Sequence, residues 1–311
     1  MTFVQLEYLV AVDTYRHFAQ AAEHCFVTQP TLSMQLKKLE DELGVLLFDR
    51  SKQPVIPTEA GIEIIAQAKK ILAEKSLIAD IVHSRKGMIA GELKLGIIPT
   101  LAPYLLPLFI HQFIRKYKNV KLVVTELTTG NIITRLKDGR LDAGILVTPL
   151  QEAGITEHVL FYEEMMVYAS PQNDMYGKKY VLAKDIDPNK LWLLEEGHCF
   201  RSQIMNLCEL QKESKSIHRF EYEAGSIDTL RRMVDISDGI TIIPEIATIS
   251  FTKKQEQCLR HFKSPIPMRE VSLAVHRDFV KKRLVDILTK EILNGVPQKI
   301  KQNKSKRVVP I

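Results

Sequence analysis

The sequence predicts an all-α head joined by a long linker helix to a C-terminal α/β region with two lobes. Three observations support this prediction. Short apolar helical stripes fill the first sixty residues, one long amphipathic helix follows, and from Gly91 onward short apolar strands alternate with helices. At 311 residues the chain is long enough for two or three domains, each with its own core.

Composition indicates an ordinary soluble protein, with 45% hydrophobic and 26% charged residues. No apolar run approaches the roughly 18 residues that cross a bilayer, and the N-terminus lacks the features of a signal peptide. We therefore expect a cytoplasmic protein with no membrane partner. The net charge of +6 is weak evidence for nucleic-acid binding, because residues 1–90 hold ten basic and eleven acidic residues, a net charge of −1, whereas residues 299–307 contribute +5.

The first sixty residues have the spacing of three short helices. The first two carry apolar stripes made of Phe3, Leu6, Leu9, Val10 and Val12, and of Phe18, Ala19, Ala21, Ala22 and Cys25. In the third, Thr28 can cap the helix, Pro30 is tolerated in its first turn, and Gly44 ends it. Its predicted buried stripe is Leu32, Leu36, Leu39 and Leu43.

Polar side chains are concentrated at the front of the third helix. They are Thr28, Gln29, Thr31 and Ser33, which flank Pro30, with Gln35, Lys37 and Lys38 along the sides. Short hydroxyl and amide groups at a helix N-terminus can reach base edges and phosphates, as a DNA recognition helix requires. The periodicity alone leaves open a generic helical hairpin with a polar outer face.

The next segment predicts a wing and a linker. Arg50 and Lys52 lie among turn-forming residues, as expected beside a DNA duplex. A long helix follows from about 58 to 86, capped by Thr58, with apolar positions at Ile62, Ile65, Ala66, Ile71, Leu72 and Ile78. Because this helix is too long to cover so small a head alone, we expect it to pair with a second subunit.

Beyond Gly91 the pattern is that of an α/β domain. Expected strands are 93–98, 122–124, 143–147, 165–168, 191–194, 219–222, 240–243 and 271–275, and expected helices are 103–117, 130–139, 226–237 and 279–294. Helices between the first three strands predict a largely parallel sheet, and 200 residues fit two lobes with a ligand cleft between them. The tail from Pro297 has no packing pattern, so we expect it to be disordered, with nonspecific phosphate contact as one option.

The chain has four cysteines, Cys25, Cys199, Cys208 and Cys258, which in a reducing compartment are by default small buried hydrophobes. Their spacing excludes a zinc site. A helix after His198 would put Cys199 at its N-terminus, where the dipole favours a thiolate, with His198 and Arg201 as sources of positive charge. If residues 199–208 are helical, the two Cα atoms are about 13 Å apart and face opposite sides, whereas a disulfide requires about 7 Å or less.

The run AAEHCFVTQPTLSMQLKKLEDELGVLLFDR, residues 21–50, resembles the winged helix-turn-helix of LysR-type transcriptional regulators. This resemblance implies a homodimer or homotetramer that binds double-stranded DNA at promoters and works with RNA polymerase. It implies base contacts from Gln29, Pro30 and Thr31, supporting contacts from Thr28, Ser33 and Gln35, and a wing contact from Arg50. It also implies that the α/β lobes resemble type 2 periplasmic binding proteins.

These inferences define the expected domains. Residues 1–58 form the winged helix-turn-helix, 59–90 the linker and dimerisation helix, and 91–296 the two-lobed regulatory domain, with 297–311 as the basic tail. Lobe I is expected at about 91–162 and 269–296, and lobe II at about 163–268.

Two further stretches, GHCFRSQIMNLC at 197–208 and IIPTLAPYLLP at 97–107, are similar to the hydrogen-peroxide-sensing activators of oxidative-stress genes within that family. The similarity implies that Cys199 is the peroxidatic thiol and Cys208 the resolving thiol of a disulfide switch. It implies a peroxide pocket containing Thr100, Thr129, His198, Asp228 and Arg269, although the register leaves open whether Arg269 or Glu270 faces that pocket. It further implies a glutaredoxin-type or thioredoxin-type reductant, and we expect no cofactor and no metal.

Three other functions compete with this one. A LysR-type regulator could answer a small organic anion in the lobe cleft, with the cysteines incidental. A thiol peroxidase would use Cys199 catalytically, but the helical head does not support an enzyme. A solute-binding protein is excluded by the missing signal peptide.

Overall fold

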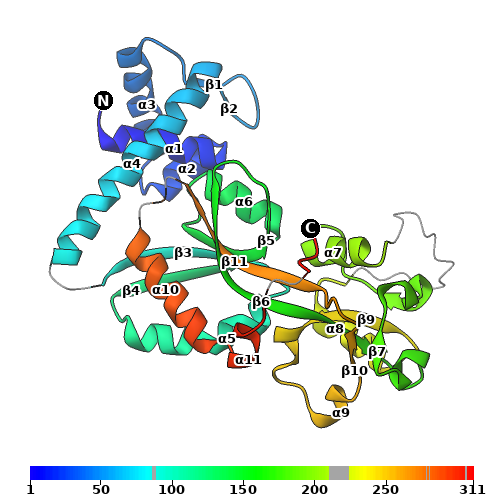
Figure 1. The fold of residues 1–311 in the computed structure, drawn as a ribbon. Coiled ribbons are helices and arrows are strands. Elements are labelled where there is room, and N and C mark those ends of the chain that lie inside the picture. The colour runs from blue at the N-terminus through cyan, green and yellow to red at the C-terminus, as the bar shows by residue number, and fades with distance from the viewer. Residues whose placement is uncertain (86–88, 210–223, 278, 280, 305–306) are drawn as a thin grey trace. The chain divides into compact units, whose positions relative to one another are not determined.

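The computed structural model describes residues 1–85, 89–209, 224–277, 279, 281–304 and 307–311 (Figure 1). It divides into two compact units, Met1–Ile89 and Ala90–Ile311. In neither unit does a described helix combine the length and apolarity needed to cross a membrane.

The N-terminal unit consists of helices and one short hairpin. Its elements are α1 (Phe3–Tyr15), α2 (Phe18–His24), α3 (Gln29–Leu43), β1 (Phe48–Asp49), β2 (Ile56–Pro57) and α4 (Glu59–Arg85). The strands β1 and β2 are antiparallel. Local sequence explains the helix ends, because Thr28 caps α3 by accepting a hydrogen bond from the Thr31 N–H, and Gly44 ends it at a φ of +70° that favours glycine.

The core of this unit forms between α1, α2 and α3, as the spacing predicts for Leu32, Leu36 and Leu39, each with 0% exposure. Phe3 of the first predicted stripe and Ala19 of the second are exposed, so those two positions were wrong. Leu43 is different, since 37% of it is exposed. The chain turns at Gly44, and Leu47 and Phe48 of the following segment are buried instead. The prediction that Leu43 belongs to the buried stripe is therefore wrong.

The first half of the C-terminal sheet holds the three expected parallel strands β3 (Gly91–Ile97), β4 (Val120–Glu126) and β5 (Ala143–Thr148), linked by α5 (Ala102–Lys116) and α6 (Thr129–Lys137). The long strand β11 (Met268–His276) then pairs antiparallel with β5 and with β6 (Ile155–Ala169). The sheet is therefore mixed, not largely parallel, because β11 returns in the opposite direction.

Strand β6 carries the chain into the second half of the sheet. Its residues 155–164 pair with β11, and its last residues pair antiparallel with β9 (Ile240–Pro244) and β10 (Leu259–Phe262). Smaller elements complete this half: β7 (Tyr180–Val181), β8 (Leu191–Trp192), α7 (Cys199–Leu207), α8 (Ile227–Asp235) and α9 (Lys253–Glu256), with short 3-10 turns at 174–177, 183–185, 188–190 and 245–248. The strand expected at 219–222 lies outside the described residues.

Helix α10 (Lys282–Gly295) leads into the C-terminal tail, which is ordered where the structure describes it. A short helix α11 (Gln298–Lys301) buries Ile300, and farther along Val309 is also buried. Val308 forms a parallel bridge with Met268. The expectation of a disordered tail is corrected by these contacts, because apolar residues scattered among the lysines find places in an existing core.

The burial pattern of α3 leads to a test of stability. We expect Leu36→Ala to lower the free energy of unfolding by about 2–5 kcal/mol, because it removes buried methyl groups and leaves a cavity. Leu43→Ala, the matched control on the same helix, should cost about 0.5 kcal/mol or less because Leu43 is half exposed. Urea unfolding of both variants measures the difference, and equal costs would contradict the assigned core.

Candidate functional site

The two cysteines of interest stand at opposite ends of α7. Gly197 has a φ of +93°, a conformation that suits glycine, and turns the chain so that His198 is the N-cap and Cys199 the first helical residue. Cys208 is the C-cap. The expected helix is confirmed, and nine helical steps place the two Cα atoms about 13 Å apart. Both thiols are free.

The apolar face of α7 is packed into the core of the second half of the sheet. Phe200, Ile204 and Leu207 are each 4% exposed or less and belong to one buried cluster with residues of β6 and β9. Unwinding the helix would therefore expose apolar surface or force it to repack. For three such side chains the cost is on the order of several kcal/mol.

Arg269, on β11, is the buried cation beside this helix. Its side chain is 0% exposed, its Nε donates to Glu163 at 2.7 Å, and its Nη1 donates to the Thr100 hydroxyl at 3.1 Å. Its guanidinium lies 5.0 Å from the centre of the Phe200 ring. Glu270 faces the other side of the strand, where it accepts a hydrogen bond from Thr148. Arg269, not Glu270, therefore faces the site.

Glu163 fixes the position of that guanidinium. Burial raises the pKa of Glu163, while the Arg269 charge and a hydrogen bond from the Ile246 N–H oppose the shift. Because arginine stays protonated in proteins, both donors match the ionised carboxylate. The positive charge of Arg269 is thus paired inside the protein.

Thr129, the first residue of α6, supplies a second hydroxyl. Its Oγ1 is buried and makes no hydrogen bond of normal geometry, yet it lies close enough to the Cys199 sulfur to lower the pKa of that thiol. A buried hydroxyl without a full partner is costly unless something occupies the space beside it. The Thr129 hydroxyl is therefore a candidate partner for a small polar ligand at Cys199.

Burial dominates the acid–base state of Cys199, which is 7% exposed. Desolvation raises the pKa of the Cys199 thiol, and Thr129, Arg269 and the N–H groups at the start of α7 oppose the increase. The helix end and the arginine favour the thiolate, as the spacing predicts, but they oppose a larger effect of desolvation on the pKa of this thiol. Burial also raises the pKa of Cys208 to about 11.

The other predicted pocket residues have different positions. His198 is buried and lies 3.5 Å from Glu195. Asp228 is more than half exposed in the first turn of α8, where it faces Arg231 at 3.8 Å. Arg201 donates to the Leu194 carbonyl at 2.7 Å. The structure thus brings Thr100, Thr129, His198 and Arg269 toward Cys199, and leaves Asp228 at the surface.

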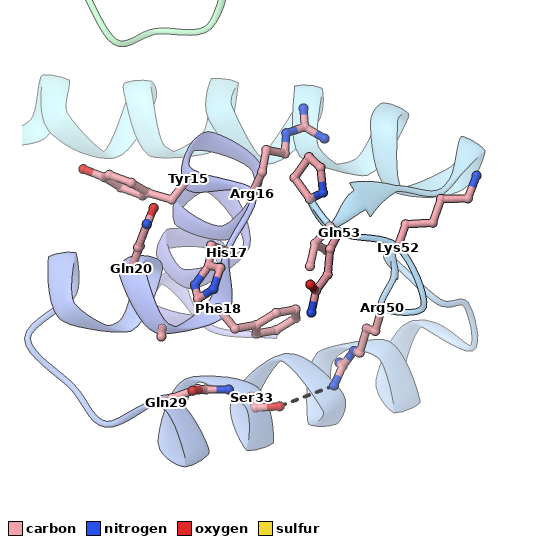
Figure 2. A pocket seen from close by; sticks show the side chains of 13 residues that line it. Tyr15, Arg16, His17, Phe18, Gln20, Gln29, Ser33, Arg50, Lys52 and Gln53 are labelled. Carbon is pink, nitrogen blue, oxygen red and sulfur yellow. Dashed lines mark hydrogen bonds between the residues drawn. The ribbon is translucent and has the colours of Figure 1, made fainter.

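The N-terminal unit carries a groove of about 590 Å³ between the front of α3 and the wing (Figure 2). Its polar lining includes Gln29, Ser33, Arg50 and Lys52, which the sequence singled out. It also includes residues that sequence reasoning missed: Tyr15, Arg16, His17, Gln20 and Gln53. These side chains come from the end of α1, the start of α2 and the wing turn. Only the fold brings them to one groove.

The predicted DNA-contacting residues fall into two groups. Gln29 and Pro30 are exposed at the front of α3, whereas the hydroxyls of Thr28 and Thr31 hydrogen-bond each other at 2.9 Å and close the helix cap. Thr28 therefore has a structural task. Gln35, one turn farther along, is half-buried.

Arg50 is held in place by the body of the head. It forms an ion pair with the buried Glu40 at 2.7 Å, donates to Ser33 at 3.3 Å, and stacks 5.0 Å from the Phe18 ring (Figure 2). Its side chain remains 38% exposed at the groove. This arrangement presents a positive charge in a fixed place, as phosphate binding favours.

Comparison with known proteins identifies the family. Residues 3–62 match the bacterial regulatory helix-turn-helix protein, lysR family, and residues 86–294 match the LysR substrate binding domain. This chain belongs to the LysR family of bacterial regulators. The expected combination of a helix-turn-helix head with an α/β regulatory domain is thereby confirmed.

Within the family the chain is similar to proteins with peroxide-related names. It is 35% identical to the hydrogen peroxide-inducible genes activator of Dickeya chrysanthemi, over 88% of both chains. It is 34% identical to the DNA-binding transcriptional dual regulator OxyR of Escherichia coli K12, again over 88% of both chains. Full-length OxyR C199D from Pseudomonas aeruginosa has a TM-score of 0.76 at 35% identity, with 94% of this chain and 98% of that one covered.

The raised pKa of Cys199 predicts how its reactivity depends on pH. Because the folded thiol is protonated at neutral pH, alkylation of Cys199 by iodoacetamide should speed up about tenfold per pH unit and continue to do so beyond about 8.5. In urea-unfolded protein the rate should level off near that value. Peptide mass mapping measures both rates, and a plateau below pH 7 in the folded protein would show a resting thiolate instead.

Proposed function

We propose that this chain is a DNA-binding transcriptional activator that senses hydrogen peroxide through Cys199 and a Cys199–Cys208 disulfide. The observation that carries the proposal is the placement of Cys199, which is buried at the start of α7 beside Arg269 and the Thr129 hydroxyl, with Cys208 at the other end of the helix. Support also comes from the relatives named for peroxide-inducible gene activation.

The site suits a small uncharged peroxide. Thr129 Oγ1 lies beside the Cys199 sulfur and can exchange a hydrogen bond with the peroxide, and Thr100 and Arg269 provide further polar groups. Because Glu163 pairs with Arg269, an anionic effector would gain less from this guanidinium than from an unpaired one. This observation favours peroxide over the small organic anion of the competing interpretation.

The first chemical step oxidises Cys199. Its sulfur attacks one peroxide oxygen, so an S–O bond forms and the O–O bond breaks. The thiol proton ends on the departing oxygen, which leaves as water, and Cys199 becomes a sulfenic acid. The raised pKa of the resting thiol requires that this proton leave the sulfur as the attack proceeds, with Arg269 stabilising the developing negative charge.

The second step forms the disulfide. The Cys208 sulfur attacks the sulfur of the sulfenic acid, an S–S bond forms, the S–O bond breaks, and the hydroxyl leaves as water with the Cys208 proton. A dithiol reductant of the glutaredoxin or thioredoxin type restores both thiols by supplying two electrons and two protons. Because about 13 Å of helix separates the Cα atoms, α7 must unwind for the bond to form.

The disulfide then acts on transcription through the oligomer. We propose a homodimer or homotetramer in which repacking around α7 changes how the heads meet a promoter and RNA polymerase. Gln29, Pro30 and Thr31 are assigned to base contacts, and Arg50 to the backbone. We assign no enzymatic turnover. A thiol peroxidase would consume peroxide catalytically with a reductant, and measuring that consumption separates the two functions.

The switch is tested by footprinting one promoter fragment with reduced and peroxide-treated protein. Wild type should change its footprint on oxidation, and Cys199→Ser should keep the reduced pattern because it cannot form the sulfenic acid. Cys208→Ser should also fail to switch, since it forms no disulfide. Cys258→Ser is the matched control, because that buried thiol lies outside α7, donates to the Lys254 carbonyl, and should leave the response intact.

A peroxide-treated wild type with no Cys199–Cys208 crosslink in mass mapping would falsify the disulfide switch. An inducer response that survives in Cys199→Ser would favour the organic-anion regulator. Neither result would change the DNA-binding assignment.

The role of Arg50 is tested by salt titration of DNA binding. We expect Arg50→Ala to weaken promoter binding about tenfold or more, because a charge-assisted contact is lost. It should also reduce the slope of log affinity against log salt by about 1. Lys121→Ala, which removes an exposed lysine of the C-terminal unit, is the control of equal charge. Equal slopes for the two variants would remove Arg50 from the DNA interface.

A further inference from the structure

The C-terminal tail crosses the long strands β6 and β11 and ends against α7. After α10, Lys299 pairs with Glu245 at 3.0 Å, and Asn303 donates to the Tyr162 carbonyl of β6 at 3.2 Å and to Glu245 at 2.8 Å. Figure 1 shows the C-terminus, in red, beside α7. The tail is therefore attached at two separate places.

The last residues form a short extension along β11. The Met268 N–H donates to the Arg307 carbonyl at 2.8 Å, and the Val309 N–H donates to the Met268 carbonyl at 2.9 Å. Met268 is the neighbour of Arg269, so the strand that presents the guanidinium to Cys199 also fixes the tail.

Two side chains of α7 hold the end of the tail. Gln203 Nε2 donates to the Val309 carbonyl at 2.7 Å, and Asn206 Nδ2 donates to the Pro310 carbonyl at 3.3 Å. Gln203 is 0% exposed and Val309 3%, and Val309 belongs to the buried cluster that contains Phe200, Ile204 and Leu207. Both hydrogen bonds and the apolar contact therefore link the tail to the helix between the two cysteines.

These contacts depend on the helical form of α7. Gln203 and Asn206 are three residues apart, which puts them on one side of a helix and over successive carbonyls of the tail. A Cys199–Cys208 bond must bring the two Cα atoms from about 13 Å to about 7 Å or less. The residues that must unwind are the residues that hydrogen-bond to the tail. The disulfide and these tail contacts therefore exclude each other.

We propose that residues 307–310 are a latch that holds α7 helical in the dithiol form and is released when the disulfide forms. The proposal rests on the proposed redox function. The latch stabilises the dithiol form selectively, so it sets how readily peroxide-derived oxidation ends in a disulfide. Its release also frees a C-terminal segment with Lys304 and Arg307 at the surface.

The first test uses the full-length wild type in both redox states. Carboxypeptidase Y digestion, followed by mass spectrometry, should remove residues 307–311 at least about tenfold faster from the oxidised protein than from the reduced protein. Equal rates in a sample whose Cys199–Cys208 disulfide is confirmed would overturn the latch and leave the peroxide switch standing. If no disulfide forms at all, both proposals fail.

The second test measures the thiol–disulfide equilibrium against a glutathione buffer. Asn206→Ala, and a chain lacking residues 308–311, should each shift the equilibrium about tenfold toward the disulfide, because contacts present only in the dithiol form are lost. That shift corresponds to about 30 mV for a two-electron couple.

Asn303→Ala is the matched control for this equilibrium. It removes tail contacts to Tyr162 and Glu245 and none that the structure records to α7. Its equilibrium should stay within about twofold of wild type. A shift equal to that of Asn206→Ala would show general loosening of the tail and would overturn the latch, as would an unshifted equilibrium in both latch variants.

Discussion

The ion pair between Arg269 and Glu163 is the constraint on which the regulatory unit depends. Both side chains have 0% exposure, and removing either partner would leave an uncompensated charge, at a typical cost of about 3–5 kcal/mol. The pair joins β11 to β6, the two strands that connect the halves of the sheet. Through Thr100 and Phe200 the same guanidinium also contacts the segment after β3 and the start of α7. One buried charge therefore fixes the elements that surround Cys199.

Around this charge the site balances desolvation against polar contacts. Desolvation raises the pKa of the Cys199 thiol, while Thr129 and Arg269 oppose that increase. The helix that starts at Cys199 has two alternative states. Its apolar face is packed in the helical state, and its two thiols cannot form a bond without a change of conformation. The reactivity of Cys199 therefore depends on its neighbours at the start of α7, whereas the conformational change depends on the packing of the whole helix.

Local sequence predicted the helices that have clear capping residues at their ends. Thr28 and Gly44 bound α3, and His198 precedes α7, because caps act through neighbouring backbone groups that sequence spacing reveals. The position of Cys199 at a helix N-terminus was therefore predictable. Thr100, Thr129 and Arg269 came from family resemblance, since they are distant from Cys199 in sequence and reach it only through the fold, whereas His198 directly precedes it.

Features that depend on tertiary contacts were not predictable. The direction of β11 requires knowing which strands it pairs with, and the side that Arg269 faces depends on that register. The spacing shows a helix dipole that favours the Cys199 thiolate, but it does not show the depth of burial that raises the pKa of this thiol. The tail was misjudged because Val309 fits a core built by residues about a hundred positions earlier.

The Glu40 carboxylate connects the two parts of the head that are assigned to DNA contact. It accepts hydrogen bonds from Arg50 on the wing and from the Leu47 N–H after Gly44, so the wing and α3 are joined through one buried group. The two DNA-facing parts of a head then move as a single rigid body. The spacing between α3 and the wing is therefore fixed within one head, so that regulation of DNA binding would act on whole heads and not on the shape of one.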